Sequence, residues 1–352
     1  MNGKERVNAV LAGMPVDRMP VFYMGTPPVD GAVMRALGIA SSSKAVPDES
    51  DVAMALGADV LFVRPRFMPG HGRIGGFRTR EVHAHMHQEA GYESVAIPRG
   101  PLVDATTADD VYAAGCWPDP DHFEYDLTGE DLDPCETPCV VARGNNSMVL
   151  SASALRGMEN LMMDMALNPE LTAAVFRRVT DFNTERLDRF LASSGRHVDV
   201  VDIGDDIAGQ NGMLFSVDMF RAYIRPQLER LVATIRRHGK VPLFFGCGGF
   251  RDVLDEFVEL GITSVGRMQS EARGNEFGGL VHDYGGRVVF WGALDAQHAL
   301  VERDPAGAAE YVRGIIGLAH GRGLVAGPTH TFTEDTPVAN VLACYRAIGT
   351  IG

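Results

Sequence analysis

The sequence has few cysteines and lacks a long apolar run. No apolar stretch approaches the ~20 residues that a membrane helix needs, and the segment from residue 1 to 20 carries charges where a signal peptide needs its apolar stretch. Five cysteines in 352 residues form no disulfide framework, and an odd number of them is typical of thiols in a reducing compartment. We therefore expect a cytoplasmic protein without a membrane segment.

Basic residues are also scarce. The chain has 32 Lys and Arg against 46 Asp and Glu, which gives a formal net charge of -14. Such a charge repels phosphate backbones and anionic lipid headgroups, so neither nucleic acid nor a membrane surface is an expected partner. The hydrophobic fraction of 45% is that of a globular chain with a sizeable core.

Short β-branched runs alternate with longer amphipathic segments such as Val217–His238, whose apolar residues recur at helical spacing. Eight runs are predicted as strands: Met19–Gly25, Ala58–Pro65, Ser147–Ser153, Val198–Gly204, Val241–Gly246, Ile262–Met268, Val288–Gly292 and Leu324–Gly327. This alternation predicts an α/β protein with a single (β/α)8 TIM barrel over residues 1–352. An open doubly wound sheet is the alternative, but the segment MGTPPVDG after the first run is not a glycine-rich phosphate turn.

Residues 66–146 separate the second and third predicted strands and form a predicted insertion over the barrel mouth. Their segment GFRTREVHAHMHQEAGYESVAI alternates as a hairpin does, and it would place His83, His85 and His87 on one face. A metal site is one interpretation of this row. A plain solvated hairpin is favoured, because a flat row of three lacks the convergent geometry that zinc requires.

In a barrel of this kind the active site is built from residues that follow the strands. Here those positions are strongly polar. They comprise Arg64 and Arg66 after the second run, Asp202, Asp205, Asp206 and Gln210 after the fourth, Cys247 after the fifth, Gln269 after the sixth, Asp295 and Gln297 after the seventh, and His330 after the eighth.

Two of these positions carry the strongest chemical signal. Cys247 lies between glycines in FFGCGGF, where it could serve as a metal thiolate or a reactive thiol, or fill a tight turn as a small apolar residue. His330 could be a metal ligand, a proton donor or a structural hydrogen-bonding group. The adjacent Asp205 and Asp206 point in different directions, so one is expected to face the site while the other caps the helix that begins near Ser216.

Several motifs in order resemble those of the uroporphyrinogen decarboxylase superfamily, including its cobamide-dependent methyltransferase branch. They include RVNAVLAGMPVDRMPVF, GCWPDPDHF, VVDIGDDIAGQNG, FFGCGGF and GPTHTFTEDTP. The resemblance implies a (β/α)8 barrel. In the decarboxylase branch an arginine-rich segment after the first strand binds the substrate carboxylates, but here YMGTPPVDGAVMRAL has no arginine before Arg35, so porphyrinogen decarboxylation is not expected.

The methyltransferase branch implies a zinc ion held by a His-x-Cys after the fifth strand and by a Cys or His after the eighth, where it activates a thiol acceptor. The cysteine of that motif falls on Cys247 and the last ligand on His330, whereas the histidine position is Phe245. Phe245 cannot bind zinc. Asp206 or Asp205 would have to supply the missing ligand, or the site would lack the metal.

We therefore expect a methyltransferase that moves a methyl group between a methylated small substrate or corrinoid protein and a thiol or folate acceptor. Zinc and a methylcobamide or tetrahydrofolate are the cofactors implied, and a homodimer is one option for assembly. One alternative is a metal-independent decarboxylase or lyase of a small carboxylic acid, and another is a non-catalytic ligand-binding protein or corrinoid partner. The expected catalytic residues are His330, Asp205 and Asp206, the metal ligands Cys247, His330 and Asp206, and the substrate-binding residues Arg64, Arg66, Gln210, Gln269 and Asp295.

Overall fold

The computed structural model describes residues 1–39, 49–67, 100–127, 138–143, 146–321 and 323–352. Its strands are β1 (Val60–Val63), β2 (Arg66–Phe67), β3 (Phe123–Glu124), β4 (Cys139–Arg143), β5 (Val200–Ile203), β6 (Ala208–Gly209), β7 (Gly212–Met213), β8 (Val241–Phe245), β9 (Ser264–Met268), β10 (Val289–Leu294) and β11 (Leu324–Pro328). Its helices are α1 (Gly3–Leu11), α2 (Pro27–Ala36), α3 (Glu49–Ala55), α5 (Ala108–Ala113), α6 (Val149–Arg156), α7 (Met158–Leu167), α8 (Pro169–Ser194), α9 (Val217–Met219), α10 (Arg225–Arg237), α11 (Leu254–Leu260), α12 (Phe277–Tyr284), α13 (Ala299–Glu302), α14 (Pro305–Leu318) and α15 (Val338–Ile348). Within this part of the chain no helix is long and apolar enough to cross a membrane.

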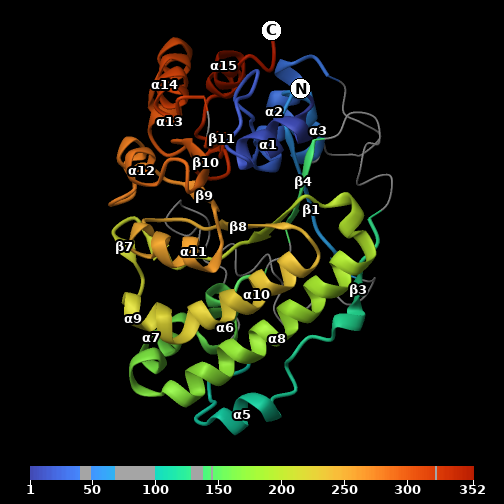
Figure 1. The fold of residues 1–352 in the computed structure, drawn as a ribbon, viewed down its shortest axis with the longest axis vertical. Coiled ribbons are helices and arrows are strands. Elements are labelled where there is room, and N and C mark those ends of the chain that lie inside the picture. The colour runs from blue at the N-terminus through green and yellow to red at the C-terminus, as the bar shows by residue number, and fades with distance from the viewer. Residues whose placement is uncertain (40–48, 68–99, 128–137, 144–145, 322) are drawn as a thin grey trace.

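Seven parallel strands form one curled sheet in the order β1-β4-β5-β8-β9-β10-β11. Helices cover the outer face of this sheet, with α8 packed along α10 and α14 packed along α15 at the end where both termini lie (Figure 1). The strands are buried almost throughout, as expected for a parallel sheet that lies beneath helices. The helices between the strands provide the crossovers that parallel pairing requires.

The segment from Pro20 to Phe22 closes the sheet into a barrel. On one side the Phe22 amide donates to the Ala326 carbonyl of β11 at 2.9 Å, and the Ala326 amide donates to the Pro20 carbonyl at 2.8 Å. On the other side the Asp59 amide, just before β1, donates to the Val21 carbonyl at 2.7 Å. The first predicted strand therefore lies between β11 and β1 and is the eighth segment of the barrel wall. The predicted (β/α)8 barrel is confirmed.

The third predicted strand is wrong. Ser147–Ser153 lies mostly in helix α6. The third strand of the barrel wall is instead β4, which pairs with β1 and β5. Both segments are short apolar runs, which periodicity alone cannot assign to strand or helix. The Asp205 carboxylate stabilises the helical conformation here, because it accepts hydrogen bonds from the amides at the start of α6.

The described part of the segment between β1 and β4 includes β2, α5 and β3. Strand β2 pairs antiparallel with β3, so the chain shortly after β1 lies beside Phe123 and Glu124. The predicted hairpin with His83, His85 and His87 lies outside the described residues, as does Cys135. Cys139 is fully buried in β4.

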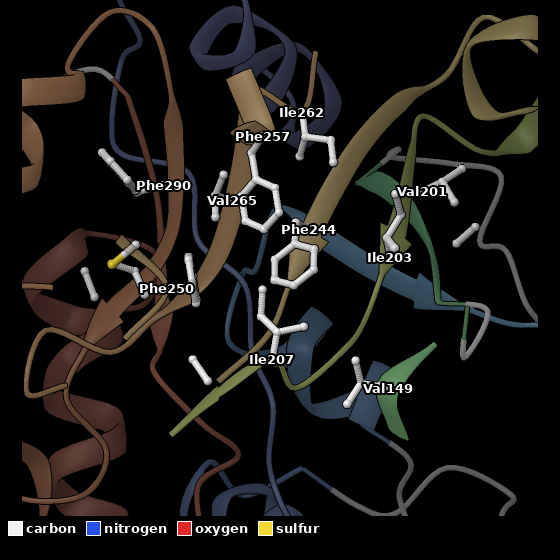
Figure 2. Close-up of a cluster of buried hydrophobic side chains, with 14 of the residues drawn as sticks. Val149, Val201, Ile203, Ile207, Phe244, Phe250, Phe257, Ile262, Val265 and Phe290 are labelled. Atoms are coloured by element: carbon white, nitrogen blue, oxygen red, sulfur yellow. The ribbon is translucent and has the colours of Figure 1, made fainter. Parts of the chain in front are cut away.

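Apolar side chains fill two regions on either side of the barrel wall. Outside it, Phe244 of β8 packs against Phe257 of α11 with ring centroids 4.4 Å apart, next to Val265 and Ile203 (Figure 2). Inside it, the neighbouring residue Phe245 packs with Phe22 and Trp291 in a separate cluster. Successive side chains of a strand point to opposite faces, so this alternation fills both the barrel and the layer beneath its helices.

Candidate active site at the carboxyl ends of the barrel strands

Charged side chains converge at the carboxyl ends of four neighbouring strands. Arg143 is the last residue of β4, Asp202 lies near the end of β5, Arg267 near the end of β9, and Cys247 two residues beyond β8. These strands are adjacent in the sheet. This is the end of a (β/α)8 barrel at which active sites are built.

Phe245 connects the two arginines. The guanidinium carbon of Arg267 lies 5.1 Å from the centre of the Phe245 ring, and that of Arg143 lies 5.9 Å from the same centre and 4.2 Å from that of Phe62. Guanidinium groups are attracted to the faces of aromatic rings at such distances. The Phe245 ring is itself fixed by Phe22 and Phe62, with ring centroids 5.9 and 6.3 Å away.

Asp202 lies between these charges. Its Oδ2 is 3.7 Å from Arg143 Nε, while its Oδ1 is buried and has no hydrogen-bond partner. Burial raises the pKa of Asp202 to about 6, and the charges of Arg143 and Arg267 oppose that increase. Asp202 can therefore exchange a proton close to neutral pH.

Replacing Asp202 is expected to change the pH dependence of stability. The pKa of Asp202 is about 6 in the folded protein and near 3.8 in the unfolded chain, so between these values the folded state holds a proton that the unfolded state releases. The free energy of unfolding contributed by this group therefore decreases as pH rises through that window. We expect Asp202→Asn to be more stable than wild type by about 3 kcal/mol at pH 8 and by less than about 1 kcal/mol at pH 4.

Urea unfolding at both pH values measures this difference. Asp252→Asn at an exposed position is the control, and it should change stability little at either pH. A difference between Asp202→Asn and wild type that is the same at pH 4 and pH 8 would contradict the assignment.

Cys247 is held between an arginine and an aspartate. Arg267 Nη1 lies 3.4 Å from Cys247 Sγ, and the Cys247 amide donates to Asp206 Oδ1 at 3.1 Å. Burial raises the pKa of the Cys247 thiol; the Arg267 charge lowers it, and the Asp206 charge raises it. The structure thus brings the predicted residues Cys247 and Asp206 together and adds Arg267, which the sequence did not single out.

Two amide side chains fix the loop that carries Cys247. Gln269 Oε1 accepts from the Gly248 amide at 2.6 Å and from Gln210 Nε2 at 3.1 Å, and Asn275 Nδ2 donates to the Gly248 carbonyl at 2.9 Å. Gly248 has a φ of +83°, which favours glycine. Gln210 and Gln269, predicted to bind substrate, have hydrogen bonds that brace this loop.

Two of the predicted carboxylates cap helices. Asp205 accepts from the amides of Met148, Val149 and Leu150 at 2.8–3.0 Å, at the start of α6. This geometry favours the capping alternative for Asp205, although the helix is α6 and not the one near Ser216, whose own hydroxyl accepts from the Met219 amide. Asp295 likewise accepts from the amides of residues 297, 298 and 299, at the start of α13.

The other predicted residues are more dispersed. Arg64 is exposed in the turn after β1, and the backbone of Arg66 lies in β2. His330 is half-buried in the loop after β11. Its neighbour Thr329 donates to Glu271 Oε1 at 3.3 Å; burial raises the pKa of Glu271, and its Oε2 has no hydrogen-bond partner.

Sequence reasoning missed Arg143, Arg267 and Glu271. Arg143 and Arg267 each lie within a run that is otherwise apolar, at the end of a barrel strand. A charged residue at such a position is rarely buried without a partner or a function, and this signal could have identified both. Glu271 carries no comparable signal, since it lies in a polar loop.

The described residues do not fit a zinc ion at Cys247. Among them no group of three His, Cys, Asp or Glu side chains is arranged to hold a metal. The position beside Sγ is taken by the guanidinium of Arg267, whose positive charge repels a cation. Phe245 stands at the histidine position of the resembling family and packs into the barrel core.

Comparisons with known proteins agree with the fold and the resemblance. The family model described as uroporphyrinogen decarboxylase (URO-D) matches residues 145–351. A solved structure named as a methyltransferase from Methanosarcina mazei superposes with a TM-score of 0.65 and 18% identity, covering 99% of this chain and 98% of that chain. No curated protein sequence matches. The family match extends over more than half of the chain, from α6 to the C-terminus, and the protein therefore belongs to the uroporphyrinogen decarboxylase family.

Proposed function

We propose that this protein is an enzyme that transfers a methyl group to or from a small substrate at the mouth of its barrel. The observation that carries this proposal is the placement of Cys247 between Arg267 and Asp206 at the carboxyl end of β8. The likeness in fold to a methyltransferase over nearly the full length of both chains supports it. A corrinoid protein as methyl donor and a thiol or folate as acceptor belong to the same proposal.

In this reaction Cys247 contacts the reacting group, and the residues around it hold it in place. Gln269 and Asn275 hold the backbone of Gly248, which follows Cys247 in the chain, so the loop that carries the sulfur is fixed. Arg267 and Asp206 set the charge around the sulfur. Such fixed positioning lowers the barrier for transfer between two bound groups.

Methyl transfer is expected to depend on Cys247. Purified protein is incubated with methylcobalamin or small methylated donors and with thiols or tetrahydrofolate, and the methylated product is measured by mass spectrometry. Cys247→Ser should lower turnover by at least ~100-fold, as expected for loss of a group that contacts the reacting atoms. Cys116→Ser, at a half-buried cysteine between α5 and β3, is the matched control and should retain activity.

Full turnover in Cys247→Ser would contradict this role. A tightly bound ligand without turnover across the whole panel would support the non-catalytic alternative.

A second candidate function is the metal-independent decarboxylation of a small carboxylic acid. The observation that favours it is Asp202, a buried carboxyl with a pKa of about 6 that lies beside an arginine and can deliver a proton. Its rate should then decrease as pH rises through about 6, because the proton donor is lost. Release of CO₂ without a methylated product would establish this candidate over methyl transfer.

A further inference from the structure

We infer that Arg143 and Arg267 form a binding site for a carboxylate group of the substrate, in the place where a related barrel would hold a metal ion. This inference specifies the substrate class and rests on the proposed function. The site differs from the arginine-rich segment after the first strand that the resemblance implies, because that segment lacks its arginines here and these two residues come from β4 and β9.

The first argument is that both guanidinium groups are positioned before any ligand binds. Each lies over the Phe245 ring, which is only 3% exposed and is packed against Phe22 and Phe62. Arg143 also lies over the ring of Phe62. An arginine that is already ordered loses less conformational entropy when it binds an anion.

The second argument is that a donor of this cluster lacks a partner. Arg267 Nε is buried without a hydrogen-bond partner. Buried polar atoms without partners cost free energy, and they are rare in folded proteins. A carboxylate offers two acceptor oxygens in the planar arrangement that a guanidinium binds best.

The third argument is that Arg267 disfavours a cation bound to Cys247. Arg267 Nη1 lies 3.4 Å from Cys247 Sγ, so a divalent ion bound to this sulfur would meet a guanidinium at short range. The aromatic ring at position 245 supplies no ligand and stabilises the two arginines instead. The substitution of the histidine by Phe245 therefore fits a change from metal binding to anion binding.

Three other arginines of the described chain bind carboxylates of the protein itself. Arg156 is satisfied by Asp164 and by the carbonyls of residues 102 and 103. Arg6 and Arg18 bind Asp59 at the opposite end of β1. Arg177 is exposed on helix α8, outside the barrel wall, and supplies a matched control.

Isothermal titration calorimetry tests the site without any turnover. The probes are acetate, propionate, succinate and benzoate, with propionamide as the uncharged equivalent of propionate. Wild-type protein should bind at least one carboxylate and not the amide. Arg143→Met and Arg267→Met should each weaken binding by ~10-fold or more, while Arg177→Met should leave it unchanged.

Lysine variants separate a binding role from a folding defect. Arg267→Lys keeps the positive charge but loses the planar pair of donors, so its affinity should fall between those of wild type and Arg267→Met. Circular dichroism of each variant verifies that it is folded. Equal affinity for propionate and propionamide, no binding of any carboxylate, or an equal loss of binding in Arg177→Met would overturn the inference.

Metal analysis tests whether the arginine pair has replaced a metal site at Cys247. Wild-type protein prepared without chelators or a histidine tag should contain no stoichiometric zinc by plasma mass spectrometry. Zinc in stoichiometric amount that disappears in Cys247→Ala would overturn this part of the inference. Carboxylate binding that depends on both arginines, in a protein that transfers no methyl group, would leave the inference standing while the proposed function fails.

Discussion

Asp59→Ala is expected to lower the free energy of unfolding by about 3–5 kcal/mol, which would be one of the largest effects of any single substitution in this barrel. Asp59 is 2% exposed and accepts from Arg6 Nη1 at 2.5 Å, from Arg18 Nη1 at 2.6 Å and from the Val21 amide at 2.9 Å. Without the carboxylate, the buried Arg6 loses a partner. The segment from Pro20 to Phe22, which closes the barrel, also loses the hydrogen bond from its Val21 amide. Urea unfolding followed by circular dichroism measures the change.

Asp17→Ala is the matched control for Asp59→Ala. Asp17 also binds Arg6, but its side chain is 47% exposed. An exposed ion pair contributes about 0–1 kcal/mol, so this variant should remain close to wild type. Similar losses in both variants would show that the Arg6 contacts, and not closure of the barrel at Asp59, determine the effect.

Gly248→Ala is expected to reduce turnover by about 100-fold or more, because it displaces the neighbouring Cys247. Gly248 has a φ of +83°, and an added Cβ would lie 2.6 Å from the carbonyl carbon and oxygen of Ala208 and 2.7 Å from the Gly209 amide nitrogen. Those atoms are backbone, so the loop itself must shift. The kcat/KM for methyl transfer measures the loss, and we expect stability to decrease by about 1–3 kcal/mol as well.

Gly239→Ala provides the control for backbone strain alone. Gly239 follows α10 with a φ of +69°, and an added Cβ there would meet no atom within 4 Å. This variant should lose about 1 kcal/mol of stability and keep its kcat/KM. If Gly248→Ala retained the kcat/KM of wild type, the position of the Cys247 loop would not matter for turnover.

Much of the barrel could be predicted from the order of short apolar runs. The runs at Val198–Gly204, Val241–Gly246 and Ile262–Met268 coincide with β5, β8 and β9, since buried parallel strands are continuously apolar. The same reasoning failed at Ser147–Ser153. There the deciding contact is with Asp205, which is distant in sequence and adjacent only in the folded chain.

The sequence also placed Cys247 at a strand end and proposed Asp206 beside it, but it did not identify Arg267. Gln269 lies at the predicted site, yet it binds the Gly248 backbone. Arg267 lies two residues earlier, and its contact with Cys247 depends on the pairing of β8 with β9. Local patterns report which side chains are buried, whereas they carry no information about which charges meet across a sheet.

The sequence by itself determined the family, the alternation of strands and helices, and the end of the barrel at which the candidate site lies. Only the tertiary structure decided that Arg143 and Arg267 share the ring of Phe245, that Asp205 caps α6, and that the segment near Val21 closes the barrel. The physical reason is that hydrophobic periodicity is a local property of the chain. Strand order, register and barrel closure bring distant residues together, and they fix which of the polar side chains form the site.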